Sequence, residues 1–154
     1  MTVRPTQRYG VDLYTGLSTE GKPVTISQRE NLAFAALTGD SHPIHYDEAF
    51  AARTRHGRCL VHGLLLASIG AFGATALSSE VEDAMVAFLD SEFQFLRPVF
   101  IGDTVTSHFT VAAIEHKPDR NRSLVSFDMW LSNAAGETVM QGKHRYLVLT
   151  TPRE

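Results

Sequence analysis

The chain has 154 residues, of which 44% are hydrophobic and 20% are charged, and its formal net charge is −3. This composition predicts a folded chain with one domain over residues 1–154 and excludes a disordered protein. The small negative charge argues against a nucleic-acid partner, because the chain has no strong basic field to displace counterions from phosphates.

The single cysteine, Cys59, excludes a disulfide within the chain. That is typical of a reducing compartment, so we expect a cytoplasmic protein. Residues 1–10 lack the apolar core of a signal peptide. Residues 59–79 carry no Asp, Glu, Lys or Arg, which raises the question of a membrane span. The stretch contains His62 and three glycines and ends in Ser and Thr, which favours a buried helix and no membrane association.

The first part of the chain predicts an irregular arm over residues 1–22 and a short strand over residues 22–27. Ser27 and Glu30 have the spacing of a capping box, in which each side chain bonds a free backbone N–H of a helix start. A helix is therefore predicted to begin at Ser27 and to end at Gly39. A loop rich in titratable residues follows directly.

The middle of the chain predicts a short helix over residues 47–54 and a turn over residues 55–58. Residues 62–77 are apolar almost all round, which is typical of one long helix buried on most sides. After Glu80 the pattern changes to the alternation of strands. We expect four strands in a meander, over residues 86–100, 104–113, 125–131 and 138–149.

Helices followed by strands predict an α+β fold, in which an antiparallel sheet packs on the helix at residues 62–77. The edge strands of such a sheet carry unpaired backbone groups that invite pairing with a second copy of the chain. A dimer is therefore expected.

The loop after the first helix concentrates Asp40, His42, His45 and Asp47 within eight residues around a proline. Titratable groups at this density are costly unless they are solvated, paired or functional. Asp40 and His45 can converge on one water molecule, and an imidazole exchanges protons near neutral pH. On the residues alone, a turn-forming Asp40 and a structural His45 remain alternatives.

A metal site is a rival interpretation of the same loop. The spacing His42-x-x-His45-x-Asp47 offers three ligand types and would indicate a metal-dependent hydrolase. The intervening proline makes a helical pair of histidines at this spacing unfavourable. We therefore expect no metal in this loop.

Three blocks of the chain resemble one family. Residues 34–45, with Ala51 six residues later, resemble the hydratase-2 motif of MaoC-like, (R)-specific enoyl-CoA hydratases, which have the hotdog fold. Residues 61–63, followed by an apolar helix, and residues 95–103, with their Pro-Val-x-x-Gly-Asp pattern, resemble two later blocks of the same family. The chain departs from the family at His42, where the family has Asn.

The resemblance implies a single hotdog domain that hydrates trans-2-enoyl-CoA to (R)-3-hydroxyacyl-CoA, reversibly, with no cofactor beyond the CoA of the substrate. It implies that Asp40 acts as general base on the water, and that His45 holds this water and takes part in proton delivery. The acyl-CoA is the expected partner, and the expected assembly is a homodimer or a dimer of dimers.

The start of the buried helix is the expected substrate site. The N–H of Gly63 has no partner within a helix and can donate to the thioester oxygen, although Gly63 as a packing residue is the alternative. The residues expected to contact the substrate are His62, Leu64, Leu65 and Ser68. A second set of basic residues could bind the CoA phosphates or form a solvated face; these are Arg53, Arg55 and Arg58.

Two further functions stay open on the same fold. One is an acyl-CoA thioesterase, since hotdog proteins perform both reactions. The other is a catalytically silent, acyl-CoA-binding partner subunit. The presence of both Asp40 and His45 argues against each of them.

Overall fold

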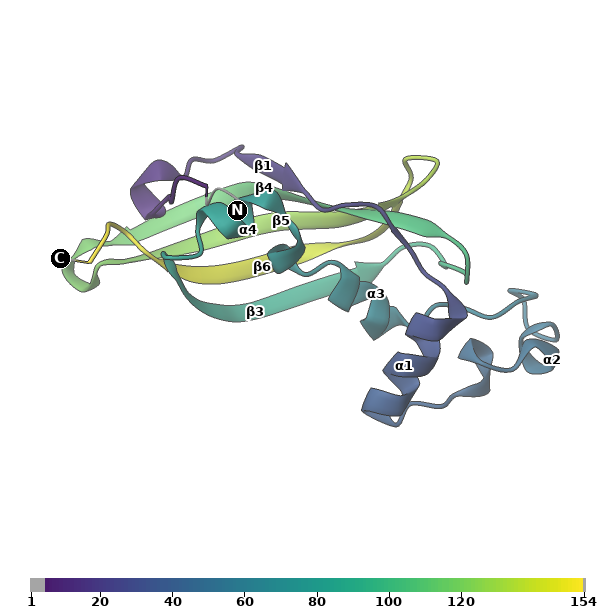
Figure 1. Ribbon diagram of the computed structural model, residues 1–154. Coiled ribbons are helices and arrows are strands. Elements are labelled where there is room, and N and C mark those ends of the chain that lie inside the picture. The colour runs from purple at the N-terminus through teal and green to yellow at the C-terminus, as the bar shows by residue number, and fades with distance from the viewer. Residues whose placement is uncertain (1–4, 154) are drawn as a thin grey trace.

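The structure is a computed structural model that describes residues 5–153, except for the side chain of Pro118. A six-stranded antiparallel sheet, in the order β1-β4-β5-β6-β3 with β2 also on β4, carries a helical segment on one face (Figure 1). The strands are β1 (Ser18–Glu20), β2 (Val24–Thr25), β3 (Met85–Phe95), β4 (Thr104–Lys117), β5 (Arg122–Asn133) and β6 (Thr138–Leu149). The α-helices are α1 (Gln28–Thr38), α2 (Glu48–Ala51), α3 (Gly63–Ile69) and α4 (Ala76–Glu80), and the 3₁₀ turns are η1 (Gly10–Asp12), η2 (Pro43–His45), η3 (Phe72–Ala74) and η4 (Pro118–Arg120).

The alternation read from the sequence places one face of the sheet in the core. Along β4, Val105, Phe109 and Val111 are all fully buried, and they alternate with partly exposed residues. At the centre of the core lies Phe72 of η3, whose ring is 4.9 Å from that of Phe127 and 5.5 Å from that of Phe109. The predicted α+β fold, with an antiparallel sheet packed on a helical segment, is confirmed.

The prediction of one continuous helix over residues 62–77 is wrong. The segment divides into α3, η3 and α4, because extended backbone interrupts it at Ala71 and Thr75. Gly70 ends α3 where the chain approaches the sheet so closely that a Cβ there would lie 2.6 Å from Met129 Cε. Thr75 begins α4 by accepting a hydrogen bond from the N–H of Ser78 at 3.3 Å. No helix within residues 5–153 is long and apolar enough to cross a bilayer.

The predicted meander holds for β4, β5 and β6 but is wrong for β3. This strand pairs with β6 and not with β4, so it forms one edge of the sheet. The predicted strand over residues 86–100 ends at Phe95, because Pro98 has no N–H to donate to a ladder. The chain then leaves the sheet, forms a bridge between Phe100 and Leu60, and returns as β4, which lies between β5 and the edge strand β1.

The N-terminal part of the chain is more regular than predicted. The expected irregular arm contains η1 and also β1, in which Ser18 pairs with Thr110 of β4. The predicted helix start is confirmed: the N–H of Arg29 donates to Ser27 Oγ, and Glu30 accepts from the N–H of Ser27. Residues 1–4 and 154, which the predicted single domain includes, lie outside the described residues.

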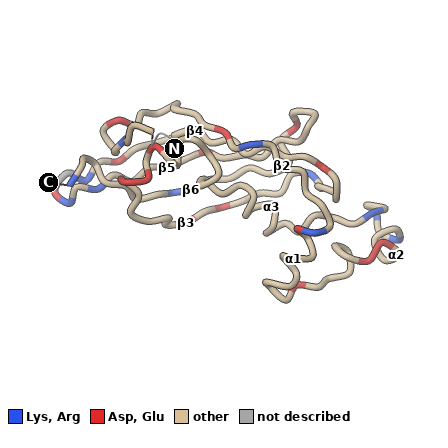
Figure 2. Tube along the Cα trace, in the orientation of Figure 1, with Lys and Arg blue, Asp and Glu red and all other residues tan. Residues whose placement is uncertain are grey.

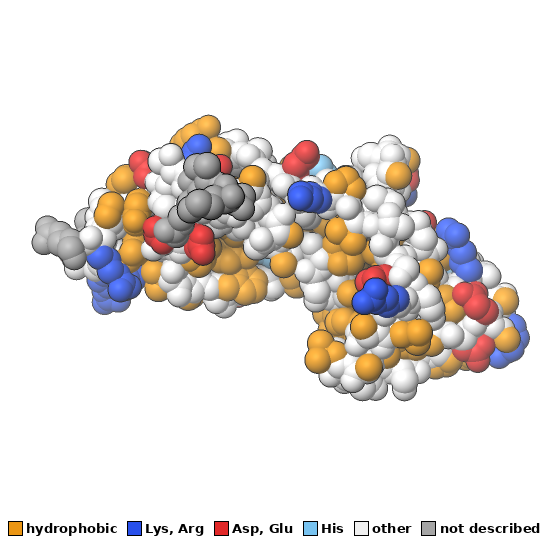
Figure 3. All heavy atoms as spheres, in the orientation of Figure 1, with side chains coloured by type: hydrophobic (Ala, Val, Ile, Leu, Met, Phe, Trp, Pro, Cys, Tyr) orange, Lys and Arg blue, Asp and Glu red, His pale blue; other side chains and the backbone are white. Residues whose placement is uncertain are grey.

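α1, η2 and α2 form a small lobe that projects beyond one end of the sheet (Figure 1). We call this part, residues 28–51, the helical lobe. Acidic and basic residues both occur on it (Figure 2). Its surface also carries hydrophobic side chains (Figure 3), and Leu37 and Leu32 of α1 are 84% and 52% exposed. α1 therefore does not bury its leucines within one chain.

Candidate active site

The loop rich in titratable residues leaves α1 through Gly39, whose φ of 76° requires the left-handed conformation that glycine adopts freely. The carboxylate of Asp40 then accepts a hydrogen bond from the N–H of His42 at 3.2 Å, which folds the loop back on itself. η2 follows at once and presents His45. The loop is thus fixed by its own backbone bonds, and Asp40 and His45 are held at its two ends.

Asp40 is hydrogen-bonded to His62, the residue that caps α3. His62 Nε2 lies 2.6 Å from Asp40 Oδ2, and His62 Nδ1 accepts from the N–H of Leu64 at 3.3 Å. Because Nδ1 is an acceptor, the proton of the neutral ring is on Nε2, which donates to the carboxylate. This bond, followed by the one from the His42 N–H, lowers the pKa of Asp40. Asp40 is therefore ionised at neutral pH and oriented by a buried histidine.

The ring of His45 lies beside that of His62, with the centroids 4.6 Å apart. Its Nδ1 is 3.0 Å from the carbonyl oxygen of Leu60, and a carbonyl can only accept. Nδ1 therefore carries the proton, and Nε2 of the neutral ring is free to accept one. Burial lowers the pKa of His45, so the neutral form dominates at pH 7. His62 thus contacts both predicted catalytic residues.

Asn31 joins the segments of this site, and the sequence analysis missed it. It is fully buried on α1, and its amide nitrogen donates to the carbonyls of His45 and Leu60, both at 3.1 Å. Its amide oxygen accepts from the N–H of His62 at 3.2 Å. One side chain therefore ties η2 to the strand bridge and to the start of α3. The only sign of Asn31 in the sequence is a polar residue within the predicted helix. Its burial becomes evident only in the structure.

We expect Asn31→Ala to damage both stability and activity. The change removes the partner of the His62 N–H and of the His45 carbonyl, at a cost of about 1–3 kcal/mol for each group left unpaired inside the chain. The free energy of unfolding, measured by urea denaturation, should fall by about 2–4 kcal/mol. The matched control Leu32→Ala, on the exposed side of the same helix, should change it far less.

A pocket with a volume of about 320 Å³ opens beside His45. Its apolar wall includes Gly63 and Leu66 of α3, together with Phe95 at the end of β3. Among the residues predicted to bind substrate, Leu64 and Ser68 lie on the exposed side of α3, and Leu65 packs against the core. In a single chain, α3 therefore contributes Leu66 to the pocket rather than Leu64, Leu65 or Ser68.

Gly63 is placed as the sequence predicts, at the first position of α3 and in the wall of the pocket. A Cβ at this position would lie 3.4–3.6 Å from the ring of Phe95, in ordinary contact. Glycine is therefore not required here by packing. Gly63 lines the pocket at the first turn of α3, where a backbone N–H has no partner within the helix.

His42 and Asp47 serve as caps. His42 Nδ1 accepts from the N–H of Ile44, and Asp47 Oδ1 accepts from the N–H of Phe50. The Asn that the family resemblance implies at position 42 could cap through its side-chain oxygen, so histidine preserves this bond. The rival metal motif is not assembled: residues 5–153 contain no group of three His, Cys, Asp or Glu side chains arranged to hold an ion.

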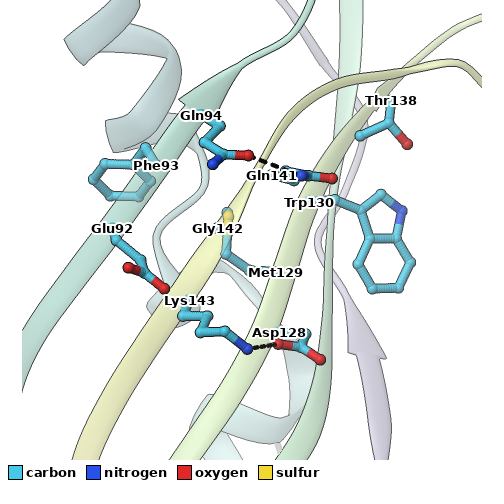
Figure 4. A pocket seen from close by; sticks show the side chains of 10 residues that line it. All are labelled: Glu92, Phe93, Gln94, Asp128, Met129, Trp130, Thr138, Gln141, Gly142 and Lys143. Carbon is cyan, nitrogen blue, oxygen red and sulfur yellow. Dashed lines mark hydrogen bonds and ion pairs between the residues drawn. The ribbon is translucent and has the colours of Figure 1, made fainter.

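A larger hollow, of about 600 Å³, lies on the sheet away from this loop (Figure 4). Four of its side chains bond one another: Lys143 binds Asp128 at 2.6 Å, and Gln141 donates to Gln94 at 3.0 Å. His45 does not line this hollow, whereas it does line the smaller pocket. The smaller pocket beside His45 is therefore the candidate active site, despite its size.

Comparison with known proteins identifies the class. The model of the MaoC like domain family matches residues 15–126, and the chain belongs to this family. An (R)-specific enoyl-CoA hydratase of Aeromonas caviae is 40% identical over 103 residues, covering 64% of this chain and 75% of that protein. A 3-hydroxybutyryl-CoA dehydratase of Methylorubrum extorquens is 36% identical over 115 residues, covering 75% and 69% of the two chains. These relatives place the chain among enzymes of the hydro-lyase type.

Solved structures agree on the fold. The monoamine oxidase regulatory protein from Archaeoglobus fulgius superposes with a TM-score of 0.90 at 29% identity, covering 98% of this chain and all of that one. The double hotdog protein Rv0216 of Mycobacterium tuberculosis superposes with a TM-score of 0.79 at 21% identity, covering 96% of this chain and 46% of that one. The predicted hotdog fold is confirmed.

Proposed function

We propose that the protein hydrates trans-2-enoyl-CoA to (R)-3-hydroxyacyl-CoA and catalyses the reverse dehydration. The observation that supports this most strongly is the set of contacts from Asp40 to His62 and from His62 to His45, of which His45 lines a pocket together with Gly63. The activities that the relatives' names state, hydration of enoyl-CoA and dehydration of 3-hydroxybutyryl-CoA, support the same reaction.

Asp40 and His45 would orient one water molecule. The ionised carboxylate and the free Nε2 are both acceptors, so each can bind one hydrogen of the water and leave its oxygen lone pair directed at C3 of the substrate. Asp40 takes the proton as the oxygen attacks, and His45 holds the other hydrogen. Exclusion of solvent by the acyl chain would make the exposed carboxylate a stronger base than it is in the free enzyme.

The attack moves negative charge to the thioester oxygen. We propose that the Gly63 N–H donates to this oxygen, since Gly63 and His45 line the same pocket and Gly63 lies at the start of α3. The resulting enolate is protonated at C2 with the proton taken from water, so that the elements of water are added across the double bond and no cofactor is consumed. The face of the double bond that the water attacks sets the configuration at C3, and we take the (R) configuration from the (R)-specific hydratase relative. Leu64, Leu65 and Ser68 stay predicted contacts of the acyl chain, and the pocket adds Leu66.

The test is an assay of the purified protein with crotonyl-CoA. The proposal predicts that the absorbance of the conjugated enoyl thioester falls with time while no free thiol appears in the presence of a thiol reagent. Release of thiol at the same rate as substrate loss would indicate the rival thioesterase. Neither signal, with an acyl-CoA that binds, would indicate the silent partner subunit.

We also propose that the enzyme is a homodimer formed along β3. This strand of 11 residues pairs with β6 on one side only, and a free edge of this length invites another strand. Apolar side chains are exposed along and just after it: Val86, Phe88, Leu89, Phe95 and Leu96, each between 37% and 53%. Phe95 and Leu96 also line the candidate active site, so a second copy on this edge would close the pocket.

Leu89→Lys should separate the dimer, because lysine on an edge strand opposes strand pairing. We expect sedimentation velocity to show a dimer for the wild type and a shift toward monomer for the variant. The control Val11→Lys changes an apolar residue that is 56% exposed but lies far from β3 in the sequence and outside the strands, and it should remain dimeric. A monomeric wild type at micromolar concentration would contradict the proposal.

A further inference from the structure

The three arginines that follow the candidate loop have different surroundings in the structure. The guanidinium of Arg53 lies 5.7 Å from the ring centroid of Phe50, and that of Arg58 lies 3.9 Å from the ring centroid of Phe100. Both make cation–π contacts with nearby aromatic rings. Arg55 instead lines the pocket that contains His45. Of the three arginines, Arg55 is therefore the candidate for contact with a ligand in the pocket.

Two more basic side chains line the same pocket, His56 and Arg97. None of the described residues in its lining is Asp or Glu. Arg97 forms an ion pair with Glu137 at 3.7 Å, too long for a strong hydrogen bond, and both side chains are more than half exposed. Its guanidinium is therefore available to a ligand.

The two arginines of the lining are open to solvent. Arg55 and Arg97 are exposed, whereas Val61 and Val99 in the same lining are buried. The two segments that carry the arginines are joined directly: the N–H of Val61 donates to the carbonyl of Val99 at 2.8 Å, and Leu60 bridges Phe100. Backbone pairing therefore holds the segments that carry Arg55 and Arg97 next to each other.

We propose that Arg55, Arg97 and His56 form a phosphate-binding mouth of the active site, which holds the phosphate groups of the CoA carrier. The inference rests on the proposed function. A pocket of about 320 Å³ is at the small end for a ligand site, so it can take the acyl group and thioester but not the nucleotide. The phosphates must then lie at the mouth, where arginine binds them with two parallel hydrogen bonds.

The experiment compares two pairs of ligands that differ in their phosphates. Steady-state hydration is measured with crotonyl-CoA and with crotonyl-pantetheine, which has the same thioester but no phosphate. Equilibrium binding of CoA and of pantetheine is measured by calorimetry, without turnover. Arg55→Gln and Arg97→Gln should each raise KM for crotonyl-CoA, and the Kd of CoA, by about tenfold, the size of one lost charge-assisted bond. The values for the pantetheine compounds should change less than twofold.

Two controls match these variants. Glu137→Gln removes the ion-pair partner of Arg97 but keeps the cation, and Arg53→Gln removes a neighbouring arginine that does not line the pocket. Neither should raise KM for crotonyl-CoA. Equal effects of Arg55→Gln on the CoA and pantetheine compounds, or no effect on either, would overturn the inference.

The calorimetric measurement separates this inference from the proposed reaction. If the wild type binds CoA more tightly than pantetheine and the arginine variants do not, the mouth binds phosphate even if no hydration is seen. If CoA and pantetheine bind equally to the wild type, the inference fails whatever the enzyme does to crotonyl-CoA.

Discussion

Replacing Asp40 with Asn should lower kcat for hydration by about 10²–10⁴-fold, the usual effect of removing a group that transfers a proton in the transition state. The amide oxygen of Asn can still accept from the N–H of His42 or from His62, and the side chain of residue 40 is 45% exposed. The loop should therefore keep its fold, with an unchanged thermal midpoint and circular dichroism spectrum. What is lost is the basic oxygen that receives the proton of water.

The matched control for this variant is Asp47→Asn. Asp47 lies in the same loop but caps α2 through its bond from the N–H of Phe50, and Asn is an equally good cap. Hydration by this variant should stay within twofold of the wild type. If Asp40→Asn retained a rate within a few-fold of the wild type, Asp40 would not be the base.

His45→Gln should also reduce kcat by about 10²–10⁴-fold, and it should change the pH profile. Protonation of Nε2 removes the acceptor that binds water. Since burial lowers the pKa of His45 below its ordinary value of 6.5, the wild-type kcat/KM should be constant near pH 7 and fall at a midpoint below 6.5. Asp40, whose pKa is lowered, remains ionised through this range. The remaining kcat/KM of His45→Gln should not fall at this midpoint.

A histidine outside the pocket provides the control. His116 on β4 is hydrogen-bonded to Ser123 at 2.8 Å, and His116→Gln should leave the acid limb of the profile in place. An acid limb that persists in His45→Gln with the same midpoint would assign the titration to another group.

The sequence predicted the parts of the site that depend on local order. The capping box at Ser27 and the apolar alternation of the strands are local patterns, and the structure confirms both. Gly39 ends α1 because its φ of 76° is left-handed, a conformation that glycine adopts freely. Asp40 and His45 were selected by their residue types and by the family motif, and the structure brings both beside His62.

Long-range partners could not be predicted from local pattern. The hydrophobic pattern of α1 gives no sign that Asn31 is buried while Leu37 is exposed, because that arrangement depends on the carbonyls of two other segments. The break of the long helix at Gly70 depends on Met129, far along the chain. His62 was predicted to contact substrate, but its Nε2 is bonded to Asp40, which only the packing of α3 against the loop can reveal.

At position 42 the chain has His where the family has Asn, but the local hydrogen bonding at this position does not require Asn. The cap on Ile44 needs an acceptor at a fixed distance from the backbone, and Nδ1 of histidine provides it. The same local bond thus holds with either residue.

The stereochemistry of the product tests the central claim most directly. Crotonyl-CoA is incubated with the enzyme until the absorbance stops falling, the thioester is hydrolysed, and the 3-hydroxybutyrate is analysed by chiral chromatography. The proposed reaction, supported by the (R)-specific hydratase relative, predicts the (R) acid. The (S) acid, a racemic product, or crotonate recovered without hydration would contradict it.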